Sequence, residues 1–303
     1  NVFSEAIMTP LKLIEEAKNE SKEALQEAEN VIDSITNKRL SFSNLNMSQP
    51  HVMGIINSTP DSFYKKSRST NSSFAIKKSN QMISDGASII DIGGESSRPG
   101  AKKISIEEGM QRVIPSIIDF KKNNLVTQIS LDTRNLPTMK LGLESGVDII
   151  NDISGFADHN KIKFVSKFNL PVIVMHMQNE PNNMQIDPKY SFAPIDIYKI
   201  LSKRVNLLIQ MGVNKSNIVV DPGIGFGKNI YHNLEILRNV SLFHSLGVPI
   251  LIGLSRKSFI HEVVVKGYKY EGITKRSISP TKRLSGSLAF AMHAYKNGIQ
   301  IIR

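Results

Sequence analysis

From residue 52 onward, short apolar runs alternate with longer segments in which apolar residues recur every three or four positions. The short runs are rich in β-branched residues and bounded by turn residues, which is typical of buried strands. The longer segments are typical of amphipathic helices. The pattern predicts strands at 52–56, 89–92, 128–131, 147–150, 171–175, 218–220, 249–253 and 300–302. It predicts helices between them at 73–85, 106–122, 137–145, 159–168, 194–211, 230–246, 258–265 and 281–297.

Eight strands that alternate with helices imply a parallel sheet with right-handed crossovers. Eight regular units favour a closed (β/α)8 TIM barrel. An open doubly wound sheet is the alternative, but the first strand is not followed by the Gly-x-Gly-x-x-Gly turn that many such sheets carry. In TIM barrels the active site lies at the carboxyl ends of the strands. Polar residues that follow the predicted strands should therefore converge on one face: Asn57, Glu95, Ser97, Arg98, Asp132, Asn151, His176, Asp221, Lys257 and Arg303.

The sixth strand shows the layout most clearly. Its apolar run, 218–220, ends at Asp221-Pro222-Gly223, and glycines recur at positions 225 and 227. A carboxylate at the tip of a buried strand is costly unless something pairs with it, and glycines let the backbone come close to a ligand. Any one such residue alone indicates a cap or an ion pair. The recurrence of the layout along the chain favours a binding site.

Residues 1–50 have a different pattern. Thr9 and Pro10 are typical of a helix start, and apolar residues at three-four spacing predict one long amphipathic helix over 10–37, with Lys18 and Ser21 interrupting its stripe. Residues 41–50 are polar and rich in helix breakers, which predicts a linker. The expected division is a helical extension and linker over 1–50 and a barrel over 51–303.

Composition narrows the function classes. The chain has 303 residues and a net charge of +11. It has no Cys, which excludes disulfides and thiol chemistry and fits a cytoplasmic protein. The charge is uneven, at −3 over residues 1–50 and +14 over the rest. A basic barrel could bind nucleic acid, but the lysines are scattered and not interleaved with aromatic residues, which favours a solvated surface. No run approaches the length of a membrane span.

The residue types in the ring indicate what it could bind. The carboxylates of Asp132 and Asp221 can accept paired N–H bonds from an amino-pyrimidine edge, and Asn151 and Lys257 can serve the other polar atoms of a flat heterocycle. Arginines and a serine-rich second loop suit a phosphate-like anion. Asn57 could bind a hard metal ion through its carbonyl oxygen.

These same residues carry a family resemblance. Residues 53–63 and 91–100 resemble the two signature motifs of dihydropteroate synthases. Four further motifs are similar and occur in the family's order, namely Ser-Leu-Asp-Thr at 130–133, Ile-Asn-Asp-Ile at 150–153, Asp-Pro-Gly-Ile-Gly-Phe-Gly-Lys at 221–228 and Ser-Arg-Lys-Ser at 255–258. The resemblance spans about 51–303, and such an ordered set is highly specific.

The resemblance implies a transferase of folate biosynthesis. The family condenses 6-hydroxymethyl-7,8-dihydropterin pyrophosphate with p-aminobenzoate, giving 7,8-dihydropteroate and pyrophosphate, and sulfonamides mimic the second substrate. By motif position the implied roles are the following: Asp132, Asn151, Asp221 and Lys257 for the pterin; Ser97, Arg98 and Arg303 for pyrophosphate or the neighbourhood of the second substrate; Phe226, Pro99 and Ser255 for p-aminobenzoate; and Asn57 for Mg²⁺. Asp132, Lys257 and Arg98 are the residues expected to act in catalysis, whereas His176 is interpreted as structural.

Two positions depart from the family's pattern. Tyr-Lys-Lys-Ser at 64–67 replaces the usual Ser-Asp-Gly-Gly, and the chain stops at Arg303, before the family's usual His. A homodimer is also expected. Some family members are fused downstream of a pterin pyrophosphokinase, and residues 1–50 could be the tail and linker of such a domain. The alternatives are a pterin-binding methyltransferase on the same barrel, or a basic nucleic-acid-binding or scaffold protein without membrane association.

Overall fold

The computed structural model describes residues 8–39, 41–58, 68–97, 100–101, 103–125, 127–270 and 278–303, without the side chains of 68–73 and 268–270. Eight parallel strands pair in the order β6-β5-β4-β3-β2-β1-β8-β7. Val220 of β6 forms a parallel bridge with Ile250, just before β7, which joins the two ends of the sheet. The strands are β1 (His51–Asn57), β2 (Ala87–Gly93), β3 (Gln128–Asp132), β4 (Ile149–Asp152), β5 (Val172–Met175), β6 (Ile218–Asp221), β7 (Leu251–Ile252) and β8 (Ile301–Ile302). The expected TIM barrel is confirmed.

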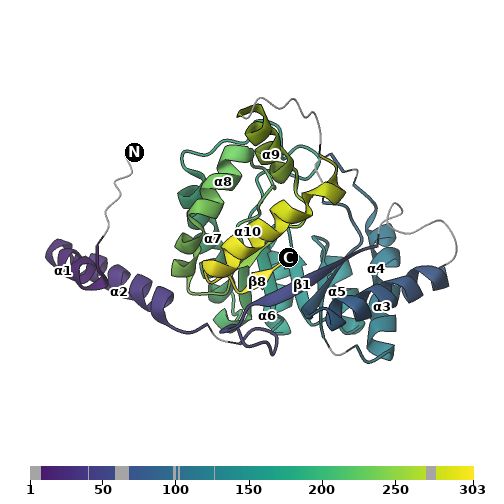
Figure 1. Cartoon of the computed structure of the whole chain (residues 1–303). Helices are drawn as coiled ribbons and strands as arrows, with labels where there is room; N and C mark the ends of the chain where they lie inside the picture. The colour runs from purple at the N-terminus through teal and green to yellow at the C-terminus, as the bar shows by residue number, and fades with distance from the viewer. Residues whose placement is uncertain are drawn as a thin grey trace.

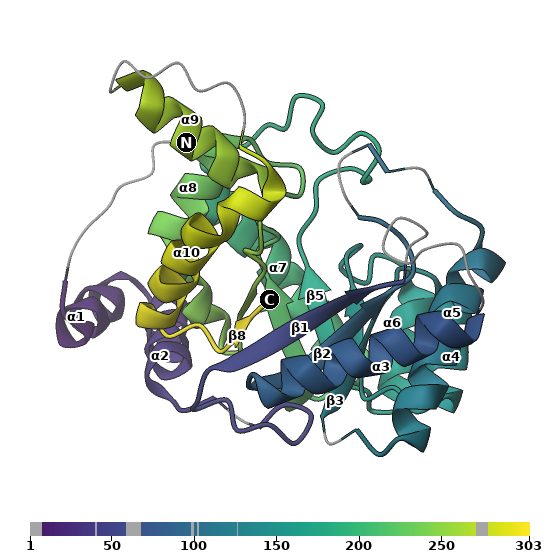
Figure 2. The same cartoon turned by 45° about the vertical axis from the view of Figure 1, so that its right-hand side comes forward.

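Helices surround the sheet (Figures 1 and 2). They are α3 (Arg68–Ser84), α4 (Ile106–Lys122), α5 (Leu136–Glu144), α6 (His159–Lys167), α7 (Ala193–Gln210), α8 (Ile230–Arg238), α9 (Ser258–Tyr270) and α10 (Leu284–Lys296), with short 3-10 helices η1 (Lys215–Asn217), η2 (Val240–Leu246) and η3 (Pro280–Arg283). The helix expected over 230–246 is two elements, because Asn239 ends α8 and the chain continues as η2. Within the described residues, no helix is both long and apolar enough to cross a bilayer.

Strand alternation divides the core into two parts. On every strand except β3, even-numbered residues such as Ile90, Val174 and Val220 pack outward against the helices, and odd-numbered residues face the inside of the barrel. On β3 the numbering is reversed, because Ile129 and Leu131 pack outward while Ser130 and Asp132 face inward. At the amino end of the barrel the inward-facing residues form one apolar layer: Met53, Ile89, Ile149, Ile173, Val219, Leu251 and Ile301. Because successive side chains point to opposite faces, the residue two positions later on each strand also faces the inside, closer to the carboxyl end.

The segment at 41–50 packs against this apolar layer. Phe42 and Met47 are both buried in contact with it, and Phe42 pairs with Leu45 in a tight antiparallel bridge. Ser43 Oγ donates to the side chain of Gln128 at the start of β3. The segment therefore closes the amino end of the barrel, whereas the sequence predicted a linker. Its packing depends on three apolar residues, Phe42, Leu45 and Met47, in an otherwise polar stretch.

The N-terminal extension is two helices, α1 (Pro10–Glu20) and α2 (Lys22–Thr36), where the sequence predicted one. Ser21 between them is extended, and its side chain accepts a hydrogen bond from Ala24 N, so it ends one helix and caps the next. The pair lies outside the ring of helices (Figure 1). Its attachment runs through α2 and η2, where Arg39 donates to the carbonyl oxygens of Ser34 (2.6 Å) and His244 (2.7 Å).

Candidate active site

The inward-facing residues at the carboxyl ends of the strands are polar and connected. Asp91, inside β2, is fully buried and accepts hydrogen bonds from Ser130 Oγ (2.7 Å), Asn151 Nδ2 (3.2 Å) and Arg303 Nε (2.7 Å). Arg303 also reaches Asp132 at the end of β3, with 3.0 Å between Nη2 and Oδ2. One guanidinium therefore bridges two carboxylates, and four strands are joined across the barrel.

The carboxyl of Asp132 is perturbed by this setting. Its pKa is raised to about 7, first by burial and then by the neighbouring charge of Asp91, while Arg303 opposes the shift. A carboxyl that titrates near neutral pH can switch between acceptor and donor under ordinary conditions. Such shifts gather at functional sites, which supports the role expected for Asp132.

A second group surrounds the end of β6. Asp221 is buried, and its pKa is raised by that burial against the opposing charge of Lys257. Its Oδ1 accepts from the backbone N–H of Gly223 at 2.7 Å. Gly223 has φ of 69°, and a Cβ there would overlap the carbonyl oxygen of His176, so only glycine permits this turn.

Lys257, which follows β7, reaches into the same group. Its Nζ donates to the carbonyl oxygen of Ile224 and lies 4.7 Å from the centre of the Phe226 ring. Burial lowers the pKa of Lys257 to about 8, partly offset by Asp221. A cation over an aromatic face beside a carboxylate offers both a polar and a flat apolar surface to a ring-shaped ligand. Phe226 packs with Ile153, Met175 and Met184 in a small apolar cluster.

His176 lies behind this group. Lys228 Nζ is 3.0 Å from His176 Nδ1 and donates to the carbonyl oxygen of Phe226 at 2.8 Å. Both side chains are buried, and that burial lowers the pKa of each well below its usual value. His176 directly follows β5, and the centre of its ring lies 6.0 Å from the centre of the Tyr190 ring. This geometry fits the structural interpretation of His176 and gives Lys228 the role of tying the β5 and β6 loops together.

The remaining expected residues lie around the rim. Glu95 pairs with Arg134 at 2.8 Å, so its carboxylate is engaged by a neighbour from the loop after β3. Ser97 is half-buried in the loop after β2, and Ser255 is exposed in the loop after β7. Arg98 and Pro99 lie outside the described residues, as does the departure at 64–67.

Asn57 ends β1, paired in register with Gly93 of β2. It is exposed, it shares the inward-facing parity of Met53, and none of the described residues bonds its side-chain amide. The described residues contain no group of three His, Cys, Asp or Glu side chains that could hold a metal ion. One neutral carbonyl oxygen fits Mg²⁺ only if other oxygens come from water and a bound phosphate, which is the usual arrangement for that ion.

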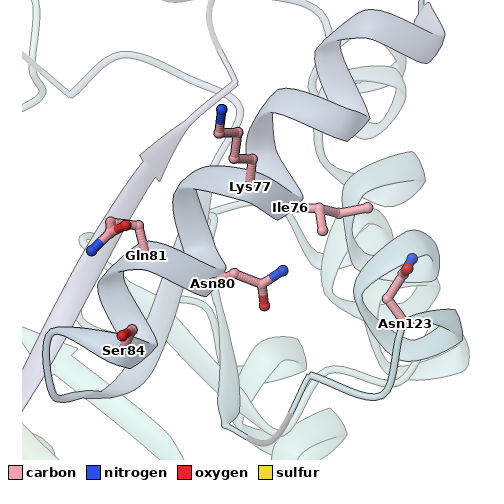
Figure 3. Close-up of a pocket in the computed structure, with 6 residues that line it drawn as sticks. All are labelled: Ile76, Lys77, Asn80, Gln81, Ser84 and Asn123. Carbon is pink, nitrogen blue, oxygen red and sulfur yellow. The ribbon is translucent and has the colours of Figure 1, made fainter.

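A hollow elsewhere on the molecule contrasts with this site (Figure 3). It lies beside the last turns of α3 and is lined by Ile76, Lys77, Asn80, Gln81, Ser84 and Asn123. It is open and carries no carboxylate or aromatic ring among those residues. The strand ends, with their buried charges, are the better candidate site.

Two polar residues of the site were not identified from the sequence. Asp91 sits inside an apolar run, and only the spacing of two from Ile89 to Asp91 and again to Gly93 indicates that it faces the barrel interior. Lys228 follows a glycine-rich turn, where an exposed lysine is the usual expectation.

Comparisons with known proteins agree with this geometry. A family model described as pterin binding enzyme matches residues 53–303. The dihydropteroate synthase of Escherichia coli K12 is 39% identical over 261 residues, covering 86% of this chain and 88% of that protein. The Yersinia pestis dihydropteroate synthase, solved with a sulfonamide drug, is similar with a TM-score of 0.75 and 36% identity, covering 86% and 90%. The Xanthomonas albilineans dihydropteroate synthase, solved with 4-aminobenzoic acid, has a TM-score of 0.76 and 32% identity, covering 88% and 92%.

Proposed function

Because the chain belongs to the dihydropteroate synthase family of folate-biosynthesis transferases, we propose that its strand-end residues bind a dihydropterin pyrophosphate and p-aminobenzoate and join them. The single observation that carries the residue assignment is the connected polar layer of Asp91, Asp132, Asn151 and Arg303 inside the carboxyl end of the barrel. The alternatives, a methyltransferase on the same barrel and a nucleic-acid-binding or scaffold protein, are not favoured by the comparisons.

The pterin part is assigned to Asp132, Asn151, Asp221 and Lys257. Asp221 at the end of β6 is buried and Asp132 at the end of β3 is largely enclosed, and each carboxylate can accept N–H bonds from an amino-pyrimidine ring. Lys257 can donate to a ring oxygen or nitrogen beside Asp221. The match of residues 53–303 to the pterin binding enzyme family supports this chemistry.

The p-aminobenzoate part is assigned to Phe226, Ser255 and Pro99. The Phe226 ring, covered on one face by the Lys257 ammonium, offers a flat surface against which an aryl ring can stack. The aminobenzoic acid bound to the Xanthomonas protein supports the substrate class. Pro99 is assigned by its motif alone, because it lies outside the described residues.

The pyrophosphate part is assigned to Ser97, Arg98 and Arg303, with Asn57 as a ligand of Mg²⁺. When bound, the metal ion would neutralise charge on the departing pyrophosphate. In the reaction the arylamine nitrogen forms a bond to the pterin methylene carbon, the bond from that carbon to pyrophosphate oxygen breaks, and the amine loses a proton. The residues of this chain act by positioning the two substrates and by stabilising charge, with the Asp132 carboxylate facing the positive charge that develops on the pterin.

The direct test is pyrophosphate release from the two substrates. We expect release only when both are present, inhibition by a sulfonamide, and loss of release in an Asp221→Asn variant with the fold kept. Asp148→Asn, at the amino end of β4 where the carboxylate bonds Ile129 N, is the matched control. No release from the folded wild-type chain with both substrates and Mg²⁺ would overturn the proposal. Filter binding to nucleic acid at two salt concentrations tests the alternative of a nucleic-acid-binding protein, which predicts binding that weakens as salt is raised.

The homodimer is proposed on the face of α10. Leu284, Leu288, Met292 and Tyr295 recur at helical spacing, and each is about half exposed. An uncharged apolar stripe can pack against the same stripe of a second copy across a two-fold axis. Sedimentation should show a dimer that Leu288→Glu converts to monomer, whereas Lys296→Glu at the helix end should not. A monomeric wild-type chain would contradict the proposed homodimer.

Cytoplasmic location and a fused upstream pyrophosphokinase stay predictions.

A further inference from the structure

We propose that Asp91 is a positioning residue that fixes which end of the Asn151 amide faces the substrate pocket. This inference rests on the proposed function and adds a residue to it. Asp91 was absent from the residues expected to act, yet it is the point at which side chains from β3, β4 and β8 meet.

The chemistry of Asp91 leaves little freedom to its neighbours. An ionised carboxylate only accepts hydrogen bonds, so every group that bonds it must present a donor. Ser130 presents its hydroxyl and Arg303 its Nε–H, so both oxygens have charged or polar partners. The Asn151 amide, 3.2 Å away, has a donor end and an acceptor end, and must turn the donor end toward Asp91.

The other end of Asn151 is therefore a carbonyl oxygen that faces away from Asp91. Among the described residues no donor bonds this oxygen, and it is not one of the fully buried side-chain atoms without a partner, so it keeps contact with solvent. An acceptor that is open on one side, on a residue that is only 5% exposed, favours a ligand that brings an N–H group. Asp91 thereby makes the β4 end an acceptor, which selects a heterocycle with a ring or exocyclic N–H at that position.

A cycle of isosteric changes tests this orientation. In the wild-type chain Asp91→Asn keeps one acceptor oxygen for Asn151 and Arg303, and its new amide nitrogen can donate to the Ser130 hydroxyl. We expect 6-hydroxymethylpterin to bind within about threefold of wild type. Asn151→Asp alone sets two carboxylates against each other, so we expect affinity to fall by about tenfold or more.

The double variant should reverse the sign of the first change. With Asn151→Asp in place, Asp91→Asn removes the repulsion between the two carboxylates and can turn its amide nitrogen toward the new carboxylate, which then presents an oxygen to the pocket again. Arg303 Nε loses the oxygen that it shares with Asn151 in the wild-type chain, so the recovery is incomplete. Asp91→Asn should therefore raise pterin affinity about tenfold in that background, although it lowers affinity slightly in the wild-type chain. Calorimetry with 6-hydroxymethylpterin measures all four proteins. Sulfonamide affinity in the presence of pyrophosphate and Mg²⁺ should stay within about twofold and serves as the reference for folded protein.

Asp91→Leu removes the acceptor altogether and completes the test. The Asn151 amide is then free to turn, and we expect pterin affinity to fall by about tenfold, with part of it regained in Asp91→Leu/Asn151→Asp. Equal pterin affinity in Asp91→Leu and wild type, or additive effects in the cycle, would overturn the inference. If Asp91→Leu does not fold, the isosteric cycle decides alone. A wild-type chain that does not bind the pterin would instead overturn the proposed function.

Discussion

The two ends of the barrel interior are built on the same strands and differ in almost every property. At the amino end, inward-facing Ile89, Ile149 and Val219 are fully buried in an apolar layer that Phe42 and Met47 close from below. At the carboxyl end, two residues further along the same strands, Asp91, Asn151 and Asp221 carry buried polar groups that engage one another or charged neighbours.

The difference separates stability from binding along each strand. A shift of two residues keeps the side chain on the inner face but moves it about 7 Å along the strand. The apolar end gains free energy from burial, while each buried charge at the other end must be compensated by a partner such as Arg303. Substitutions at the amino end should therefore change the free energy of unfolding, and those at the carboxyl end should change ligand affinity.

The largest expected effect is at the amino end. Phe42→Ala removes a fully buried ring from beneath the barrel, and such changes cost about 3–5 kcal/mol of unfolding free energy. Urea unfolding measures the loss, and Phe168→Ala, which truncates a half-exposed ring after α6, is the control. The Michaelis constants of the folded Phe42→Ala protein should stay at wild-type values. A large change in the Michaelis constants with little loss of unfolding free energy would contradict the assignment of stability to the amino end and of binding to the carboxyl end.

The next effect is at the carboxyl end. Asp221→Asn removes the buried charge beside Lys257, and the loss of one charge-assisted hydrogen bond is worth about 1.5–3 kcal/mol, or roughly ten- to hundredfold in pterin affinity. Calorimetry with 6-hydroxymethylpterin measures the loss, while Asp148→Asn at the amino end of β4 should leave affinity unchanged. An unchanged pterin titration in Asp221→Asn would contradict the assignment of this residue.

The sequence was sufficient to locate those candidate site residues that directly follow an apolar run. Asp132, Asn151 and Asp221 each come at the close of an apolar run, and the run both predicts the strand and points to its tip. The barrel could be predicted because the spacing of apolar residues within each segment is enough to tell strands from helices. The two kinds of segment then alternate eight times along the chain.

The sequence was insufficient where packing between distant segments decides. Phe42 lies in a polar stretch, and nothing local shows that it closes a barrel whose strands come later in the chain. Ser21 interrupts a helical stripe, but whether the helix continues depends on the cap that its side chain makes. Asp91 is hidden inside its strand until Ser130, Asn151 and Arg303 are brought to it from three other strands.

A third effect depends on pH. The pKa of Asp132 is raised to about 7, so the folded chain binds more protons than the unfolded chain between about pH 4 and 7, and this carboxyl contributes less stability as pH rises through that range. Pterin affinity should have the opposite pH dependence, because the pterin binds the ionised carboxylate. It should weaken about tenfold for each pH unit below 7.

An upper limit comes from Lys257, whose pKa is lowered to about 8, so its ammonium is lost above that pH. Pterin affinity should therefore be greatest between about pH 7 and 8. Calorimetry from pH 5.5 to 9 measures the profile. Asp132→Asn should remove the part of the acid limb centred near pH 7 and leave the alkaline limb, together with any acid loss due to Asp221, whereas Ser97→Ala should keep the whole profile. A profile in wild type that is flat below pH 7 would show that the Asp132 carboxylate does not contact the pterin.

The smallest effect is expected at Asn57, where the carboxyl end of the barrel meets solvent. Its side chain faces the mouth from the last position of β1, and in the described residues it holds no partner whose loss would destabilise the strand. One carbonyl oxygen among several water and pyrophosphate ligands contributes only part of the affinity for Mg²⁺. Asn57→Ala should therefore raise the Mg²⁺ concentration for half-maximal turnover by about three- to tenfold, with unfolding free energy unchanged within about 0.5 kcal/mol. Asn80→Ala, which truncates an exposed amide on α3 in the hollow of Figure 3, should leave the Mg²⁺ requirement alone. If both variants keep the wild-type Mg²⁺ concentration for half-maximal turnover, Asn57 is not a ligand of the metal ion. If Asn57→Ala instead lowers the free energy of unfolding by several kcal/mol, then Asn57 contributes to stability as the apolar residues do. On β1 the change from stabilising to ligand-binding residues would then lie closer to the carboxyl end than on the other strands.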